Sequence, residues 1–275
     1  MCDISYDIER TKDVFTLDYE EGYLQYDRIY NSSNDSYRSI ISNFDIKDKK
    51  VLSVLGSGDQ AFHLYKSGAK IVDVFDINKL TIYYYFLRIW IIKYLGRAYP
   101  PYDFDNQYII NLLGHVSPTS QLEQNAYNYW SMYVKTYDSE CNYKLFNHFL
   151  ISNSVFNQDV SDIREKISVD FNFYNIDISK KVAVDQKYDV IYTSNIAEFI
   201  HGVNSFKVYR DNLDNLLNKD GVILSSRVMR VDASKDEKKV MSKTFKLDYL
   251  PDNISMFGFI DPGYYYTKRR FKRLF

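Results

Sequence analysis

Residues 50–61 read Lys-Val-Leu-Ser-Val-Leu-Gly-Ser-Gly-Asp-Gln-Ala, and residues 71–76 read Ile-Val-Asp-Val-Phe-Asp. The apolar run before the first glycine is typical of a buried strand, and the glycines that follow it allow a tight turn. Residues 59–66 predict a short helix, which Gly68 ends. Residues 71–76 predict a second strand. This order indicates a parallel strand pair joined by a right-handed helical crossover.

The same alternation continues along the chain. Further strands are predicted at residues 171–176, 188–192 and 222–226, with helices at 77–96 and 205–217 and a turn at 218–221. Two late segments, near 244–249 and 263–268, are expected to close the sheet as an antiparallel pair. The predicted fold is therefore a Rossmann-like, doubly wound, mostly parallel α/β sheet with a helical insertion.

The expected domain organisation is an N-terminal helical arm over residues 1–46 and a Rossmann-like domain over 47–275. The stretch 97–168 shows no strand alternation and is predicted as a helical insertion, with helical blocks at 121–135 and 143–149. Tyr83, Tyr84 and Tyr85 occupy consecutive positions of the helix at 77–96, so they point around it and cannot all line one pocket.

The turn has the features of a nucleoside-binding site. Glycine lets the backbone approach a ligand where a side chain would clash, and the helix N-terminus offers unpaired N–H groups. We therefore expect Gly56, Ser57 and Gly58 to contact a cofactor. Asp76, at the end of the second strand, is placed to accept hydrogen bonds from both ribose hydroxyls.

Asp59 discriminates between the possible nucleosides. A carboxylate beside the turn would repel a pyrophosphate, whereas it suits the ammonium group of the amino-acid end of S-adenosylmethionine (SAM). This favours SAM over a dinucleotide, although a glycine turn without any ligand is the alternative.

Three blocks carry a resemblance to a known family: residues 51–61, residues 74–78 (Val-Phe-Asp-Ile-Asn) and residues 188–198 (Tyr-Asp-Val-Ile-Tyr-Thr-Ser-Asn-Ile-Ala-Glu). They resemble the SAM-dependent 3-amino-3-carboxypropyltransferases of betaine-lipid synthesis and their relatives, which look like class I methyltransferases in fold. The likeness spans about residues 50–95 and 185–230, under half of the chain, so it bears on cofactor and fold more than on the acceptor.

The resemblance implies a SAM-dependent transferase that moves the 3-amino-3-carboxypropyl group to a small-molecule or lipid acceptor. Two alternatives stay open: a SAM-dependent methyltransferase of the same fold, and a non-catalytic SAM-fold binding protein. The sulfonium of SAM activates several carbons, and alignment of the acceptor selects among them.

The remaining candidate site residues follow predicted strands, where open α/β sheets bind ligands. Gln60 is expected near the SAM carboxylate, Asn78 near the ribose, and Asp177 near the adenine amino group, with capping of the next helix as the alternative for Asp177. After the strand at 188–192, Ser194 is assigned to the cofactor. The three catalytic candidates there are Asn195 to orient an acceptor, and Glu198 and His201 as bases, with a structural role as the alternative for His201.

Composition adds limits on partners and location. With 35 basic and 36 acidic residues, the chain has no global field that favours nucleic acid. A basic run at residues 268–273 suggests peripheral contact with anionic lipid, or simply a solvated end. Neither Cys2 and Cys141 nor the histidines show metal-ligand spacing, so no metal is expected. The acidic N-terminus argues against a secretory signal, which makes the cytoplasm the expected location.

Overall fold

The computed structural model describes residues 3–16, 29–30, 41, 44–101, 104–147, 160–225, 234–237, 239 and 264–267. Its internal contacts divide the chain into two compact units. Unit 1 comprises residues 1–33, 55–62 and 78–171, and unit 2 comprises residues 34–54, 63–77 and 172–275.

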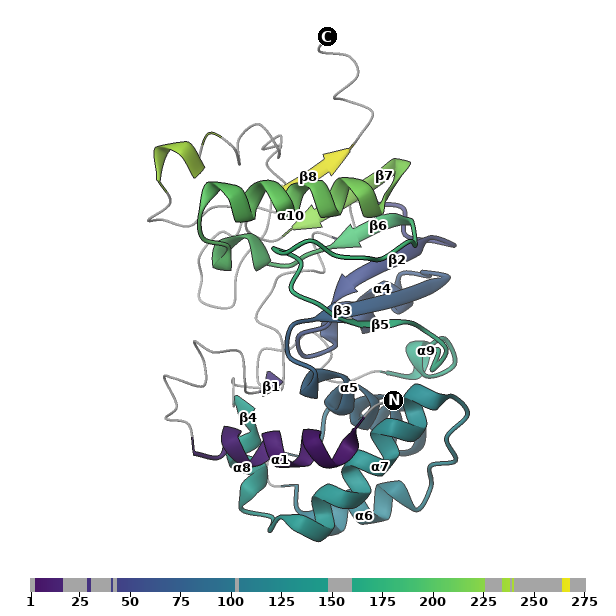
Figure 1. Ribbon diagram of the computed structural model, residues 1–275. Helices are drawn as coiled ribbons and strands as arrows, with labels where there is room; N and C mark the ends of the chain where they lie inside the picture. Colours follow the sequence, from purple (N-terminus) through teal and green to yellow (C-terminus); the bar gives the residue numbers. More distant parts are fainter. Residues whose placement is uncertain are drawn as a thin grey trace, which may run out of the picture. The chain divides into compact units, whose positions relative to one another are not determined.

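Unit 2 contains a sheet with the strand order β5-β3-β2-β6-β7-β8 (Figure 1). The first five strands of this order run parallel, and β8 pairs with β7 in the antiparallel sense. The strands are β2 (Lys50–Val54), β3 (Ile71–Asp76), β5 (Phe173–Asn175), β6 (Tyr188–Tyr192), β7 (Leu217–Ser225) and β8 (Tyr264–Thr267). The predicted fold class, a Rossmann-like, mostly parallel α/β sheet, is confirmed.

One face of this sheet is covered by helix α10 (Val203–Leu216), which crosses it in Figure 1. Apolar residues recur at helical spacing along α10, and they pack on strand residues that share one face of the pleat. The helix contributes Phe206, Tyr209, Leu213 and Leu216, and the strands contribute Leu52, Phe75, Ile191 and Ile223. This buried cluster fixes the strands whose ends carry the predicted site.

Helix α4 spans Asp59–Lys66, as predicted, and Gly68 follows it with a positive φ of 88°. Unit 1 is mostly helical. It includes α1 (Ile4–Val14), α5 (Leu80–Trp90), the π-helix η1 (Ile91–Leu95), α6 (Asn106–Leu113), α7 (Gln121–Thr136), α8 (Cys141–Leu145) and α9 (Ser161–Arg164). A short parallel pair joins β1 (Ile29–Tyr30) to β4 (Phe146–Asn147).

The core of unit 1 accounts for part of the tyrosine content. Every residue of α5 is buried, Tyr83, Tyr84 and Tyr85 included, which is the pattern of a helix surrounded by protein. Tyr83 stacks on Tyr129 of α7 with ring centroids 4.1 Å apart, and Trp130 Nε1 donates to the carbonyl of Tyr83 over 2.8 Å. These three tyrosines of α5 are therefore core residues.

Several predicted boundaries are wrong. The helical block expected at 143–149 ends at Leu145, and residues 146–147 form β4 instead. Residues 218–221 belong to β7: Leu217 lies opposite Tyr188 and Val222 lies opposite Val190, so the residues between them bulge from the ladder rather than form a separate turn. The late segment at 244–249 lies outside the described residues.

Candidate functional site

Strands β2, β3 and β6 are parallel neighbours in unit 2, so their carboxyl ends lie at one edge of the sheet. These ends are Val54, Asp76 and Tyr192. Ligands of open α/β sheets bind outside this edge. The residues that follow the three strands in the chain are therefore the candidates for a ligand site, and they include the residues that the sequence analysis predicts there.

The turn after β2 belongs to unit 1. Gly58 N donates to the carbonyl of Leu55 over 2.7 Å, and both Gly56 and Gly58 have positive φ, 49° and 86°. A Cβ on Gly58 would lie 2.5 Å from Cδ2 of Tyr85, whereas one on Gly56 would meet nothing closer than the Gln60 side chain at 3.9 Å. Gly58 is therefore required by protein packing, and only Gly56 leaves the backbone open to approach.

Asp59 is the first residue of α4 and is fully buried. Its Oδ1 accepts hydrogen bonds from Arg88 Nη1 at 2.6 Å and from Tyr99 Oη at 2.7 Å, and Ser57 Oγ donates to its Oδ2 over 3.1 Å. The sequence did not reveal these partners. The charge of Asp59 is compensated within the protein, which weakens the argument that this carboxylate would repel a pyrophosphate.

Arg88 is the second half of this buried pair. Its Nη1 also donates to the carbonyl of Ser57 over 2.7 Å, and its Nε and Nη2 donate to the carbonyl of Ala98 over 3.1 and 3.0 Å. Its Cζ lies 4.1 Å from the ring centroid of Tyr99. Burial lowers the pKa of Arg88, but the Asp59 carboxylate and the phenols of Tyr99 and Tyr84 together leave that pKa raised, so Arg88 is a permanent cation.

Two other cofactor candidates lie in unit 1. Gln60 is buried in the first turn of α4. Asn78 Oδ1 accepts from the backbone N of Leu80 over 3.0 Å, so this side chain helps begin α5. Their predicted contacts with the carboxylate and ribose of SAM stay predictions.

Asp76 ends β3 in unit 2, and its neighbour on β5 holds the backbone there. Asn175 Nδ2 donates to the carbonyls of Asp76 and Ile77 over 3.0 and 2.9 Å, and Ile176 N donates to the carbonyl of Asp76 over 3.1 Å. Sequence reasoning missed Asn175. An asparagine near the end of a predicted strand, two residues before Asp177, was the only available signal.

Asp177 has partners of its own. Its Oδ1 accepts from the N and Oγ of Ser179 over 3.0 and 2.6 Å, and Lys180 Nζ lies 3.2 Å from its Oδ2. Burial alone would raise the pKa of Asp177, but the hydrogen bonds from Ser179 and the charge of Lys180 lower it. This is the turn-capping geometry that the sequence left open beside an adenine contact, and the adenine contact stays a prediction.

The segment after β6 carries the catalytic candidates. Ser194 is buried with a positive φ of 50°, and Ser225 Oγ donates to its carbonyl over 2.6 Å. Asn195 Nδ2 donates to Glu198 Oε2 over 3.3 Å across the 3-10 helix Ile196–Phe199. His201 is exposed. The structure thus pairs Asn195 with Glu198. It also adds Ser225, which sequence reasoning missed, as the residue that holds a strained backbone beside the predicted site.

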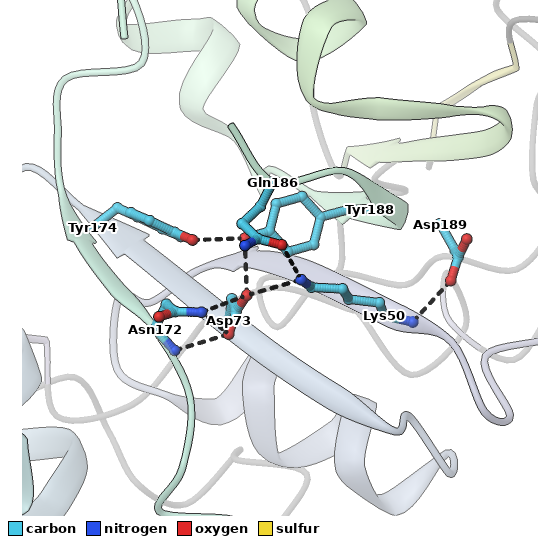
Figure 2. Close-up of polar contacts among 7 residues, drawn as sticks. All are labelled: Lys50, Asp73, Asn172, Tyr174, Gln186, Tyr188 and Asp189. Atoms are coloured by element: carbon cyan, nitrogen blue, oxygen red, sulfur yellow. Dashed lines mark hydrogen bonds and ion pairs between the residues drawn. The ribbon is translucent and has the colours of Figure 1, made fainter. Parts of the chain in front are cut away.

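A second polar cluster lies within the sheet rather than at its carboxyl edge (Figure 2). Asp73 is fully buried, and it accepts from Tyr188 Oη over 2.9 Å and from the backbone N of Asn172 over 2.8 Å. Lys50 lies 3.9 Å from the same carboxylate. Burial and the Asp73 charge raise the pKa of Tyr188, which keeps its phenol protonated. We interpret this cluster as structural.

In the described part of the chain, no three His, Cys, Asp or Glu side chains gather as a metal site would require. None of the described helices has both the length and the apolar character needed to cross a bilayer. The basic run at 268–273 lies outside the described residues.

A scan against protein-family models finds no match, and neither does a search of curated proteins. Among solved structures, the chain is similar to a ribosomal protein L11 methylase from Lactobacillus delbrueckii subsp. bulgaricus: the identity is 17%, the alignment covers 83% of this chain and 73% of that one, and the TM-score is 0.39. It is similar to the N-methyltransferase NodS from Bradyrhizobium japonicum WM9, with 10% identity, coverages of 83% and 88%, and a TM-score of 0.38. It is also similar to the glycopeptide N-methyltransferase MtfA complexed with SAM: the identity is 10%, the alignment covers 75% of this chain and 60% of that one, and the TM-score is 0.38.

Proposed function

We propose that the chain is a SAM-dependent transferase. The observation that carries the proposal is the carboxyl edge of the unit 2 sheet, where β3 ends on the carboxylate of Asp76 and β2 leads directly into the Gly56–Gly58 turn. Open α/β sheets bind nucleosides outside this edge, so we assign Asp76 to the ribose and the turn, which follows β2 in the chain, to the rest of the cofactor.

The residues present fit such a group. Asp76 supplies a carboxylate at the strand end, and Asn175 fixes the backbone that bears it. At Gly56 an added side chain would meet nothing closer than 3.9 Å, so a ligand could approach this backbone. SAM, when bound, supplies an electrophilic carbon beside its sulfonium.

Asp59 takes a different part from the one that sequence alone suggested. Its carboxylate already accepts from Arg88, Tyr99 and Ser57, so we assign it to shaping the turn. Recognition of the amino-acid end of SAM is then assigned to backbone groups of residues 56–58 and to the Gln60 amide, with Asn78, Asp177 and Ser194 completing the proposed cofactor contacts.

Two reactions fit this site. Methyl transfer is the reaction associated with a sheet of this type, and we place it first. Aminocarboxypropyl transfer is supported by the resemblance of the three sequence blocks. In both, Asn195 orients the acceptor, and Glu198 or His201 removes its proton. The acceptor is proposed to be a small molecule or a lipid.

Binding and product analysis test the proposal. Calorimetry is expected to show that the parent binds SAM and that Asp76→Ala weakens this binding at least tenfold. NAD is the control ligand, and its affinity should be the same for the parent and for Asp76→Ala. Turnover with an acceptor panel should release S-adenosylhomocysteine for methyl transfer, or methylthioadenosine for aminocarboxypropyl transfer. SAM binding without either product over a broad panel would support a non-catalytic binding protein, and no SAM binding would refute the proposed function.

A further inference from the structure

One face of α5 contacts the glycine turn within unit 1. Tyr85 and Arg88 lie three residues apart and therefore on the same side of the helix. The ring of Tyr85 occupies the space beside Gly58, and Arg88 Nη1 donates both to the Ser57 carbonyl and to Asp59 Oδ1. The turn is thus held by a side-chain packing contact and by two hydrogen bonds from one guanidinium nitrogen.

The same guanidinium holds a second segment. Its Nε and Nη2 donate to the Ala98 carbonyl, two residues beyond Gly96, which caps the C-terminal end of η1. Tyr99 completes the connection, because its hydroxyl donates to Asp59 Oδ1 over 2.7 Å while its ring lies 4.1 Å from Arg88 Cζ. Residues 98–99 and residues 57–59 therefore share one buried network.

This network cannot exchange its partners for water, since the side chains of Arg88 and Asp59 are fully buried. If either segment moves, a buried charge loses a hydrogen bond, which is costly in a low-dielectric interior. Displacement of residues 98–99 is thus coupled to displacement of the turn. Residues 98–99 also lead into α6 and α7 of the predicted insertion.

We propose that Arg88 and Tyr99 are positioning residues that couple the cofactor turn to the start of the helical insertion. The guanidinium fixes the Ser57 carbonyl and the Asp59 carboxylate. Tyr99 holds the start of the insertion to the turn through its hydrogen bond to Asp59. The inference rests on the proposed function in that the cofactor is SAM. The coupling itself is a property of the unliganded chain.

Tyr99→Phe tests the coupling, with Tyr129→Phe as its matched control. Both changes remove one buried phenol hydrogen bond in unit 1, the first to Asp59 and the second to Thr11 Oγ1 at 2.9 Å. We expect both to lower the melting temperature, and Tyr99→Phe to lower it more because its hydrogen bond goes to a carboxylate. Only Tyr99→Phe should weaken SAM binding, by about tenfold, because it alone removes a hydrogen bond to a charged group that shapes the turn.

Hydrogen exchange of the unliganded protein provides a readout that needs no SAM. Tyr99→Phe should accelerate exchange in a peptide covering residues 56–60, and Tyr129→Phe should not. Arg88→Lys is the second variant. A lysine keeps the charge but lacks the planar fork that serves three acceptors, so it should show the same pattern.

The outcomes separate the two proposals. A parent that fails to bind SAM refutes the proposed function, while the exchange data still decide the coupling. If Tyr99→Phe and Arg88→Lys both leave exchange at residues 56–60 at the parent rate, or if Tyr99→Phe binds SAM like the parent, the coupling is overturned. If neither variant folds while Tyr129→Phe does, the network serves stability alone and the inference is again overturned.

Discussion

Tyr188 and Asp73 form a hydrogen bond of 2.9 Å between strands that are not neighbours in the sheet (Figure 2). Tyr188 begins β6 and Asp73 lies within β3, with β2 between them. The phenol therefore reaches across β2 to Asp73. Through Tyr188 and Lys50 the Asp73 carboxylate connects β3 with β6 and β2, whose carboxyl ends belong to the proposed site.

Tyr188→Phe should lower the free energy of unfolding by about 1–3 kcal/mol, because the buried Asp73 carboxylate loses a charge-assisted donor. Urea denaturation measures this change. Tyr174→Phe is the matched control, since the Tyr174 phenol contacts only the Tyr188 hydroxyl among the cluster residues, at 3.1 Å, and is half-buried. An equal loss in the two variants would contradict the assigned role of Asp73.

The free energy of unfolding should fall as the pH rises above about 10, the ordinary pKa of tyrosine. Burial raises the pKa of a set of phenols, so above pH 10 the unfolded chain releases protons that the native chain retains, and the native state loses its relative stability. Each such group contributes about 1.4 kcal/mol per pH unit in that range. The phenols are those of Tyr84, Tyr129, Tyr133, Tyr188 and Tyr209.

Denaturation at pH 9.0 and pH 10.5, with tyrosinate absorbance recorded in parallel, measures this dependence. The Tyr188→Phe variant should show a shallower decline than the parent, because it has one fewer phenol to ionise on unfolding. Identical pH slopes for the two proteins would show that Tyr188 ionises as easily in the native state as in the unfolded state.

Gly58→Ala should destabilise the protein more than Gly96→Ala. Both glycines have positive φ, 86° and 63°, so both variants incur backbone strain of roughly 1–2 kcal/mol. Only the Gly58 variant adds a clash, at 2.5 Å from Tyr85 Cδ2, whereas a Cβ on Gly96 meets nothing within 4 Å. We expect a further loss of about 1–3 kcal/mol at Gly58 from overpacking. Thermal denaturation of both variants checks the difference, and equal losses would contradict the Tyr85 contact.

Asn175→Ala should weaken SAM binding while Asn172→Ala should not. Both asparagines send side-chain hydrogen bonds from the β5 segment to β3, but Asn175 holds the carbonyls of Asp76 and Ile77 and Asn172 holds the Asp73 carboxylate. Loosening the Asp76 backbone should raise the dissociation constant about three- to tenfold. Calorimetry on the pair gives the comparison, and an unchanged affinity in Asn175→Ala would remove Asn175 from the proposed site.

The repeated strand and helix signals were sufficient for the fold because periodicity and glycine placement are local. The bounds of α4 and β6 agree with the prediction, and Asp76 ends β3 as expected. The block at 143–149 was misjudged because Phe146 and Asn147 pair with residues 29–30, more than a hundred positions away in the chain. Local pattern carries no such information.

The candidate site was predictable only in outline. The strand ends were found from local signals, but the partners of Asp59 were not. Arg88 lies 29 positions further along the chain and Tyr99 lies 40 positions further, and nothing in a single sequence indicates that these side chains meet. A carboxylate next to a glycine turn therefore suggested a ligand contact where the fold supplies a buried cation.

Arg88→Met should lower the free energy of unfolding by about 3–5 kcal/mol, because it leaves the buried Asp59 carboxylate without its counter-ion. The double variant Arg88→Met/Asp59→Leu should recover much of this loss, since replacing both members of a buried pair with apolar residues removes the unpaired charge. Chemical denaturation of the parent, both single variants and the double variant gives the coupling energy. The double variant should nevertheless bind SAM more weakly than the parent, because the Ser57 carbonyl and Tyr99 have lost their partners. If the losses in unfolding free energy of the two single variants add up to the loss of the double variant, the two side chains contribute independently.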